Sequence, residues 1–144
     1  FGDLDHAGDQ DMYVVMGGAF PGDNFPNALF ENPGHGNHWI TLELEGVQAN
    51  RSAIGARIEL TVAHAEENTT FYRTVGSGGS FGASILRQEI SIGRADRIEK
   101  LRITWPDAPR RVEEYTELST NTEYFVRQSE EPMRMVRGKI VRSE

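Results

Sequence analysis

Residues 37–60 carry the pattern that most restricts how this chain can fold. Apolar and polar side chains alternate in two runs, which is the period of a strand with one buried face. The apolar positions are Ile40, Leu42 and Leu44 in the first run and Ile58, Leu60 and Val62 in the second. Turn-forming residues separate the runs at Gly46 and at residues 50–52, and Gly55 leaves room for close approach of the backbone. We therefore expect two strands joined by a long turn, with the rest of the chain packed against them.

The same alternation recurs along the chain, and no segment shows a helical period with caps. Further short strands are expected at residues 12–16, 28–30, 71–75, 86–92, 101–105, 112–115 and 124–126. Residues 76–82 are too rich in glycine for a regular element. The basic tail from residue 130 is expected to form either a charged edge strand or a frayed terminus. Many short strands separated by turns indicate an all-β fold, an antiparallel β-sandwich of about seven to eight short strands.

The composition excludes several classes of function. The formal net charge is -7, from 22 acidic and 15 basic residues, whereas binding to nucleic acid or to an anionic membrane needs a concentrated basic face. No apolar run approaches the length of a membrane span, so membrane insertion is not expected. Cysteine is absent, which excludes thiol catalysis, zinc–cysteine sites and disulfides. A chain of 144 residues can bury a core without such supports.

An acidic motif near the start of the chain predicts a cation site. Asp3, Asp5 and Asp11 follow the spacing D-x-D-x-[DN]-G-x-x-D of a calcium loop, in which alternate carboxylates supply the oxygen ligands that calcium prefers. The fifth position is Ala7 instead of Asp or Asn, so one ligand is lost and calcium binding is weakened. Asp9, at the seventh position, would offer its backbone carbonyl. Calcium binding through these four aspartates and a solvated acidic terminus remain the two alternatives.

Several short motifs occur in an order that resembles the ASPIC/UnbV domain. They are Asn50-Arg51, Ile54-Gly55-Ala56-Arg57, Gly78-Gly79-Ser80-Phe81-Gly82, Ile92-Gly93 and Trp105-Pro106. The resemblance covers residues 37–127. One departure is the Ser91-Ile92-Gly93 segment, where the family pattern has Gly-Leu-Gly. The acidic motif, followed by a strand instead of a helix, is similar to the calcium loop of FG-GAP (VCBS-type) repeats.

The resemblance implies a neighbourhood and a location more than an activity. ASPIC/UnbV domains usually follow FG-GAP repeats in large secreted or surface proteins, and the family has no established activity. Residues 1–30 are then an FG-GAP/VCBS repeat fragment and linker, which is the remnant of a β-propeller blade. Residues 31–129 form the sandwich and residues 130–144 a basic C-terminal tail. The first residue is Phe1 and not Met, as expected of a piece of a longer protein. The protein would be secreted, at the cell surface or periplasmic.

Two patterns typical of active sites do not combine into one. Residues 78–82 match the G-x-S-x-G spacing of a nucleophile elbow, with Ser80 as the nucleophile. All four histidines precede Ser80 and no helix is expected after it, so a triad in the required order cannot form, and a glycine-rich turn is the favoured interpretation. His35 and His38 have no further ligand nearby at a strand spacing, which favours surface histidines over a metal pair. We expect no enzymatic activity.

Four other side chains are candidates for ligand binding. A guanidinium at Arg51 or Arg57 would recognise a carboxylate or a sugar, or it would tie the long turn to the sheet, which we favour. Tyr72 and Phe125 are out of phase with the inner faces of their strands and would offer aromatic faces to a sugar ring.

The sequence therefore favours a non-catalytic module for protein interaction, adhesion or scaffolding in a larger extracellular FG-GAP protein, with a weak calcium loop. Its partner would be a protein or a glycan at the cell surface. A carbohydrate-binding module is the alternative, and an uncharacterised accessory domain of an enzyme is the third possibility. The oligomeric state stays open.

Overall fold

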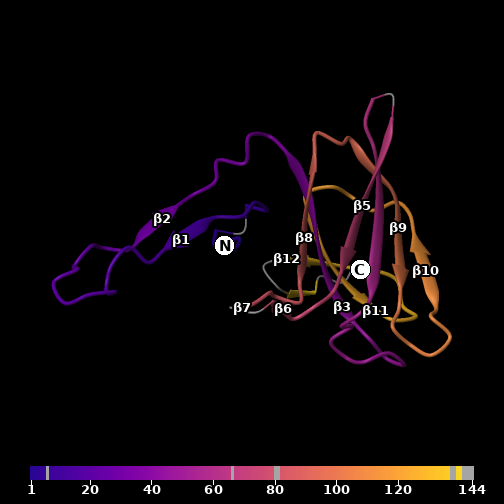
Figure 1. Ribbon diagram of the computed structural model, residues 1–144. Coiled ribbons are helices and arrows are strands. Elements are labelled where there is room, and N and C mark those ends of the chain that lie inside the picture. Colours follow the sequence, from indigo (N-terminus) through magenta and orange to yellow (C-terminus); the bar gives the residue numbers. More distant parts are fainter. Residues whose placement is uncertain (6, 66, 80–81, 137–138, 141–144) are drawn as a thin grey trace.

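The computed structural model describes residues 1–5, 7–65, 67–79, 82–136 and 139–140. These residues form strands and turns, and none of them lies in a helix (Figure 1). No helix long and apolar enough to cross a membrane is therefore found among them. Two sheets pack against each other around one apolar core, which confirms the expected all-β sandwich.

A four-stranded sheet forms one layer of the sandwich, in the order β10-β9-β4-β5. Its strands are β4 (Arg57–Ala63), β5 (Asn68–Thr74), β9 (Arg97–Thr104) and β10 (Val112–Tyr115). All neighbouring strands in this layer run antiparallel. The pairing between β4 and β9 shifts in register between Thr61 and Val62.

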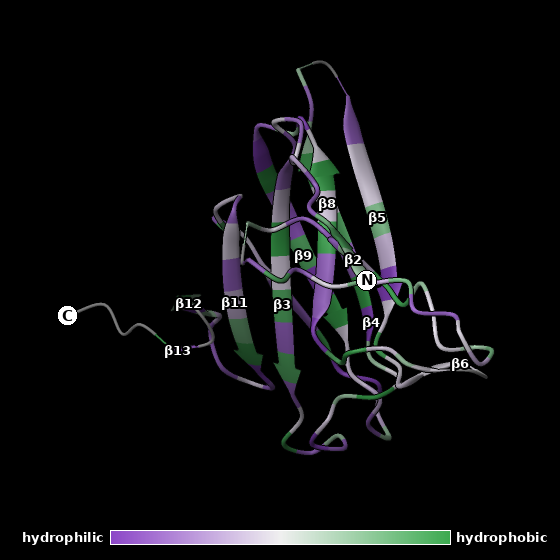
Figure 2. Ribbon diagram, turned by 90° about the vertical axis from the view of Figure 1, so that its left-hand side faces the viewer, coloured by the Kyte–Doolittle hydropathy of each residue, from purple (hydrophilic) through white to green (hydrophobic). Residues whose placement is uncertain are grey.

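A five-stranded sheet forms the second layer, in the order β13-β12-β11-β3-β8, and faces the viewer in Figure 2. Its strands are β3 (His38–Glu45), β8 (Gln88–Gly93), β11 (Thr122–Arg127), β12 (Met133–Val136) and β13 (Lys139–Ile140). Strands β3 and β11 run parallel, so the sandwich is not antiparallel throughout. A parallel pair needs a long crossover, and the chain between β3 and β11 supplies it by building the whole four-stranded sheet.

The core lies between the two sheets and follows the alternation seen in the sequence. Ile40, Leu42 and Leu44 of β3 are buried, and so are Ile58, Leu60 and Val62 of β4. The same alternation is visible along β3 in Figure 2. Trp105, just after β9, is fully buried. Each such side chain contributes roughly 1.5–3 kcal/mol by leaving water, so the two alternating runs of β3 and β4 supply the centre of the core.

The structure corrects one expectation, for residues 76–82, and decides between two alternatives for the C-terminal tail. The expectation that residues 76–82 hold no regular element is wrong: β6 (Gly78–Gly79) pairs with β7 (Gly82–Ala83) in a small hairpin. Gly78 has a φ of 107° and no side chain to meet the opposing backbone, so glycine permits this tight ribbon. In the tail, β12 pairs with β11 and β13 pairs with β12, which is the edge-strand alternative.

A separate ribbon precedes the sandwich. β1 (Met12–Val14) pairs with β2 (Ala28–Phe30) in a two-stranded sheet that extends away from the sandwich in Figure 1. Large apolar side chains of this segment are exposed: Met12, Tyr13, Val15, Met16, Phe20, Phe25, Leu29 and Phe30. A hairpin alone is marginally stable in water, so its attachment to the sandwich through the preceding acidic loop becomes important.

Candidate functional site

The acidic loop is closed by the chain itself and rests on the outer face of the five-stranded sheet. Gly2 and Asp11 exchange two backbone hydrogen bonds, of 3.2 and 2.8 Å, which bring the two ends of the loop together. Gly8 has a φ of 90°, and a Cβ atom at this position would overlap the indole ring of Trp39. Gln10 donates from Nε2 to Glu89 Oε2 at 3.0 Å. The loop therefore packs on β3 and β8 through contacts that need glycine at position 8.

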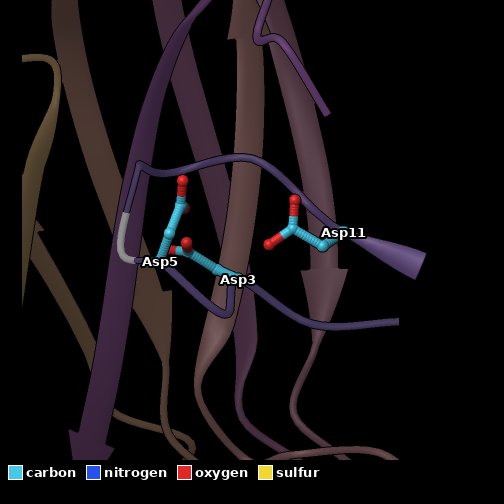
Figure 3. A group of neighbouring side chains, drawn as sticks. All are labelled: Asp3, Asp5 and Asp11. Atoms are coloured by element: carbon cyan, nitrogen blue, oxygen red, sulfur yellow. The ribbon is translucent and has the colours of Figure 1, made fainter. Parts of the chain in front are cut away.

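Three of the four predicted aspartates converge in this loop (Figure 3). One carboxylate oxygen from each of Asp3, Asp5 and Asp11 lies within 4.8 Å of the other two. Asp11 is buried and accepts backbone N–H groups from Asn32 at 3.0 Å and Leu4 at 2.9 Å. These two hydrogen bonds, the one from Asn32 first, lower the pKa of Asp11 against the opposing effect of burial. Asp11 thus remains charged and fixes the position around which the other two carboxylates gather.

The carboxylates of Asp3 and Asp5 are also shaped by the loop backbone. Asp5 Oδ1 accepts the N–H of Ala7 at 2.9 Å, and Asp3 Oδ2 accepts the N–H of Gly8 at 3.2 Å. Three negative charges this close repel one another unless a cation lies between them. Hard oxygen donors of this kind fit calcium. Because Ala7 offers no side-chain oxygen, the three carboxylates fit a weak site.

Asp9 does not join the three converging carboxylates. Its side chain lies over Gly34, and its Oδ1 is buried with no hydrogen-bond partner among the described residues. Burial is the main cause that raises the pKa of Asp9, followed by the charges of Asp11 and the other two aspartates. Only the backbone carbonyl of Asp9 is therefore left as a contribution to a cation site, as the sequence motif predicts.

A half-buried ion cluster lies beside the acidic loop and was not found by sequence reasoning. Arg87 pairs with Glu89 at 2.6 Å and with Glu123 at 3.4 Å. Burial alone would lower the pKa of Arg87, but the hydrogen bond and charge of Glu89, then Glu123 and Asp3, outweigh burial and raise that pKa. Glu89 and Glu123 are both paired with Thr41 in register, so the cluster crosses three strands. Glu123 lies 36 residues from Arg87 in the sequence, so no local motif indicates the whole cluster.

The four tentative ligand-binding residues do not form one site. Tyr72 is 66% exposed on the outer face of the four-stranded sheet, and Phe125 is half-buried on the five-stranded sheet. Arg51 extends into solvent and approaches Glu45 at 3.7 Å. Arg57 lines a small hollow at the end of β4. The two aromatic side chains therefore cannot stack on one sugar together.

The long turn after β3 is tied down mainly by amides and not by Arg51 or Arg57. Asn50 accepts the N–H of Ile54 at 2.9 Å and donates to the carbonyl of Ile54 at 2.8 Å. Gln128 Oε1 accepts three consecutive backbone N–H groups, those of Val47, Gln48 and Ala49. Arg51 ties the turn to Glu45 of β3 through an exposed contact of 3.7 Å, which agrees with the structural role favoured for it. Most of that role is carried by Asn50 and Gln128.

The remaining candidates are the nucleophile-elbow pattern and the two histidines of the predicted surface pair. Ser80 and Phe81, on which the nucleophile-elbow pattern depends, lie outside those residues. His38 Nδ1 lies 2.8 Å from Asn121 Nδ2, and His35 sits in a turn with a φ of 51°. In the described part of the chain, no histidine belongs to a cluster of three metal-ligating side chains.

Comparison with known protein families assigns this chain to a family. The family model "ASPIC and UnbV" matches residues 46–132, which is more than half of the chain and runs from the turn after β3 to the residue before β12. A search of curated proteins found no match. The matched segment contains the motifs from which the resemblance was drawn, including Asn50-Arg51 and Trp105-Pro106. The chain belongs to the ASPIC and UnbV family.

Proposed function

We propose that this chain is a non-catalytic interaction and scaffolding module of a larger extracellular FG-GAP protein, and that its acidic loop binds calcium. The observation that carries the proposal is the convergence of Asp3, Asp5 and Asp11 within a loop that packs on the sandwich. An ion held there would neutralise the three carboxylates and fix the loop. Since the loop leads directly into β1, calcium would stabilise the attachment of the ribbon to the sandwich.

The strength expected of this site suits an extracellular protein. Calcium sites with few charged ligands bind with a Kd of about 0.1–1 mM, the range of extracellular modules. Since Ala7 stands where a ligand side chain is usual, we expect the loop to bind calcium in that range. Such a site would be filled outside the cell and empty at cytosolic calcium levels.

The exposed ribbon supports the scaffolding part of the proposal. Tyr13, Leu29 and Phe30 are each more than half exposed, although strands rich in large apolar residues normally bury one face. We assign residues 1–30 to the end of an FG-GAP repeat, whose neighbouring strands would cover this surface in the longer protein. Amide hydrogen exchange in β1 and β2 should then be slower in the longer protein than in the 144-residue chain, and equal rates would contradict the assignment.

Calorimetric titration with calcium chloride tests the ion site directly. The 144-residue chain should give saturable heat with a Kd of about 0.1–1 mM, and Asp5→Asn should abolish it. Asp5 is the cleanest position because it is exposed, and its hydrogen bond to Ala7 stays within the loop. Asp96→Asn removes an exposed carboxylate elsewhere and serves as the matched control. No saturable heat, or equal binding by the Asp5→Asn variant, would end the calcium proposal.

Carbohydrate binding is the second candidate function, and a hollow beside Trp39 favours it more than the separated positions of Tyr72 and Phe125 do. Besides Trp39, the lining of this hollow includes Asp9, His35, His38 and Glu89. Sugar sites combine an aromatic face with polar side chains that bond the hydroxyl groups, and Asp9 Oδ1 still lacks a donor among the described residues.

A glycan array separates the two functions. Carbohydrate binding predicts saturable binding that is lost on His35→Ala, an exposed turn residue whose removal leaves the strands intact. Tyr72→Ala, on the other sheet, is the control and also tests whether that exposed ring binds sugar by itself. Binding to no glycan would leave the interaction module as the function.

A further inference from the structure

A small hollow at the end of the four-stranded sheet collects positive charge. It has a volume of about 210 Å³ and is lined by Arg57 from β4, by Thr104 from β9 and by Arg110 from the turn that follows. Arg57 and Thr104 are direct partners in the register of β4 and β9, so their side chains share the outer face of the sheet. The turn after Pro106 carries Arg110 to the same place.

Neither guanidinium has an anionic partner in the described chain. Two neighbouring arginines are paired: Arg102 with Glu59 at 3.3 Å and Arg111 with Asp107 at 3.6 Å. Arg73 of β5 is unpaired as well, but it donates to the carbonyl of Tyr72 at 3.0 Å and does not line this hollow. No ion pair or hydrogen bond of the described residues involves the Arg57 or Arg110 side chain. In a chain with a net charge of -7, two unpaired arginines at one hollow are an unusual concentration of positive charge.

Asp107 lines the same hollow, but its carboxylate is already engaged. The side chain is 3% exposed. Its Oδ1 accepts a hydrogen bond from the N–H of Arg111 at 2.9 Å. Its Oδ2 accepts a hydrogen bond from Nε2 of Gln128 at 3.0 Å and lies 3.6 Å from Arg111 Nε. The Asp107 carboxylate is thus held by Gln128 and Arg111, and the charge left for a ligand is that of Arg57 and Arg110.

We propose that this hollow binds one small oxyanion, a carboxylate, sulfate or phosphate group. The guanidinium forks of Arg57 and Arg110 match such groups with paired, charge-assisted hydrogen bonds. The Thr104 hydroxyl adds a neutral donor. The site is independent of the acidic loop, because all of its residues lie in the sandwich within the family-matched segment.

The backbone at Arg110 allows a sharp test. This residue has a φ of 52°, a left-handed conformation that costs energy for every residue except glycine. Arg110→Gly therefore removes the cation and relieves the backbone together. We expect this variant to lose anion binding while its Tm stays equal or rises, which separates loss of a ligand from loss of the fold.

The experiment is an NMR titration of the 144-residue chain with sodium sulfate, sodium phosphate and sodium acetate in separate arms at constant ionic strength. We expect saturable shifts of the amides at residues 55–57, 104 and 110, and a loss of affinity of about tenfold or more for Arg57→Gln and for Arg110→Gly. Arg94→Gln, an exposed arginine in another turn, should bind as the unchanged chain does. The arm with the highest affinity identifies which oxyanion the site prefers.

Two results would overturn the inference. One is the absence of saturable shifts in all three arms. The other is an equal loss of affinity in Arg94→Gln, which would mean that the anions respond to net charge and not to this hollow.

Discussion

Replacing Gln128 with alanine should destabilise the protein more than most substitutions of a single polar side chain do. Gln128 is 1% exposed and joins two turns of the sandwich. Its Oε1 accepts the N–H groups of Val47, Gln48 and Ala49 at 2.9, 2.9 and 3.0 Å, and its Nε2 donates to Asp107 at 3.0 Å. One side chain therefore holds the turn after β3 against the turn after β9.

The size of the effect follows from these four hydrogen bonds. Each contributes about 0.5–1.5 kcal/mol net, and a buried donor left without a partner costs more. Val47 and Gln48 are exposed, so water would replace part of what their N–H groups lose. We expect Gln128→Ala to lower the free energy of unfolding by roughly 2–4 kcal/mol. Against a total of about 5–15 kcal/mol, that is a large fraction.

Urea denaturation followed by circular dichroism measures this change. Gln48→Ala is the matched control, because it removes an exposed glutamine side chain from the same turn and should change stability by less than about 0.5 kcal/mol. The double variant with Asp107→Ala should show a coupling of about 1 kcal/mol. A loss below about 1 kcal/mol for Gln128→Ala would refute the idea that this side chain ties the two turns together.

Two further predictions concern the packed loop and a buried hydroxyl. Gly8→Ala should detach the acidic loop and shift the fluorescence of Trp39 to longer wavelength. Gly22→Ala, at a glycine with a similar φ of 92° but open space around it, should leave the spectrum unchanged. Equal spectra for the two variants would contradict the packing of the loop on Trp39. Tyr115 donates to Glu113 at 2.7 Å, and burial followed by that contact raises the pKa of Tyr115 above its ordinary value of 10.0. The neutral phenol therefore favours folding, and this stability is lost as the pH rises above 10. Tyr115→Phe should lose this alkaline dependence in denaturation curves at pH 8 to 11, and an unchanged pH dependence would show that another group is responsible.

The fold could be predicted from local patterns because a sandwich is built from alternating strands. Ile40 to Leu44 and Ile58 to Val62 each report burial of one face within the strand itself, and that information survives without any partner being known. The parallel pairing of β3 with β11 could not be predicted, because it depends on how two distant segments meet. The high glycine content of residues 76–82 led to the wrong prediction that they hold no regular element, because at Gly78 the absence of a side chain permits a hairpin.

The sites divide in the same way. Asp3, Asp5 and Asp11 lie within nine residues of one another, so their spacing alone indicates that they converge. Arg57 with Arg110 comes from segments far apart in the chain, which only the sheet brings together. A sequence pattern finds a site carried by one loop and misses a site carried by a surface.

The family motif itself is explained by backbone geometry. Asn50 closes a ring with Ile54, Ala53 takes a φ of 52° at a fully buried position, and Gly55 has a φ of 95° with Pro106 directly over it. None of these three backbone features needs a ligand, so this part of the motif is evidence of the fold. The acidic loop lies outside the matched residues 46–132, whereas the hollow of Arg57 and Arg110 lies inside them. Calcium binding would therefore be a property of the residues that precede the family-matched segment in this chain, while oxyanion binding would be a property that the sandwich itself can carry.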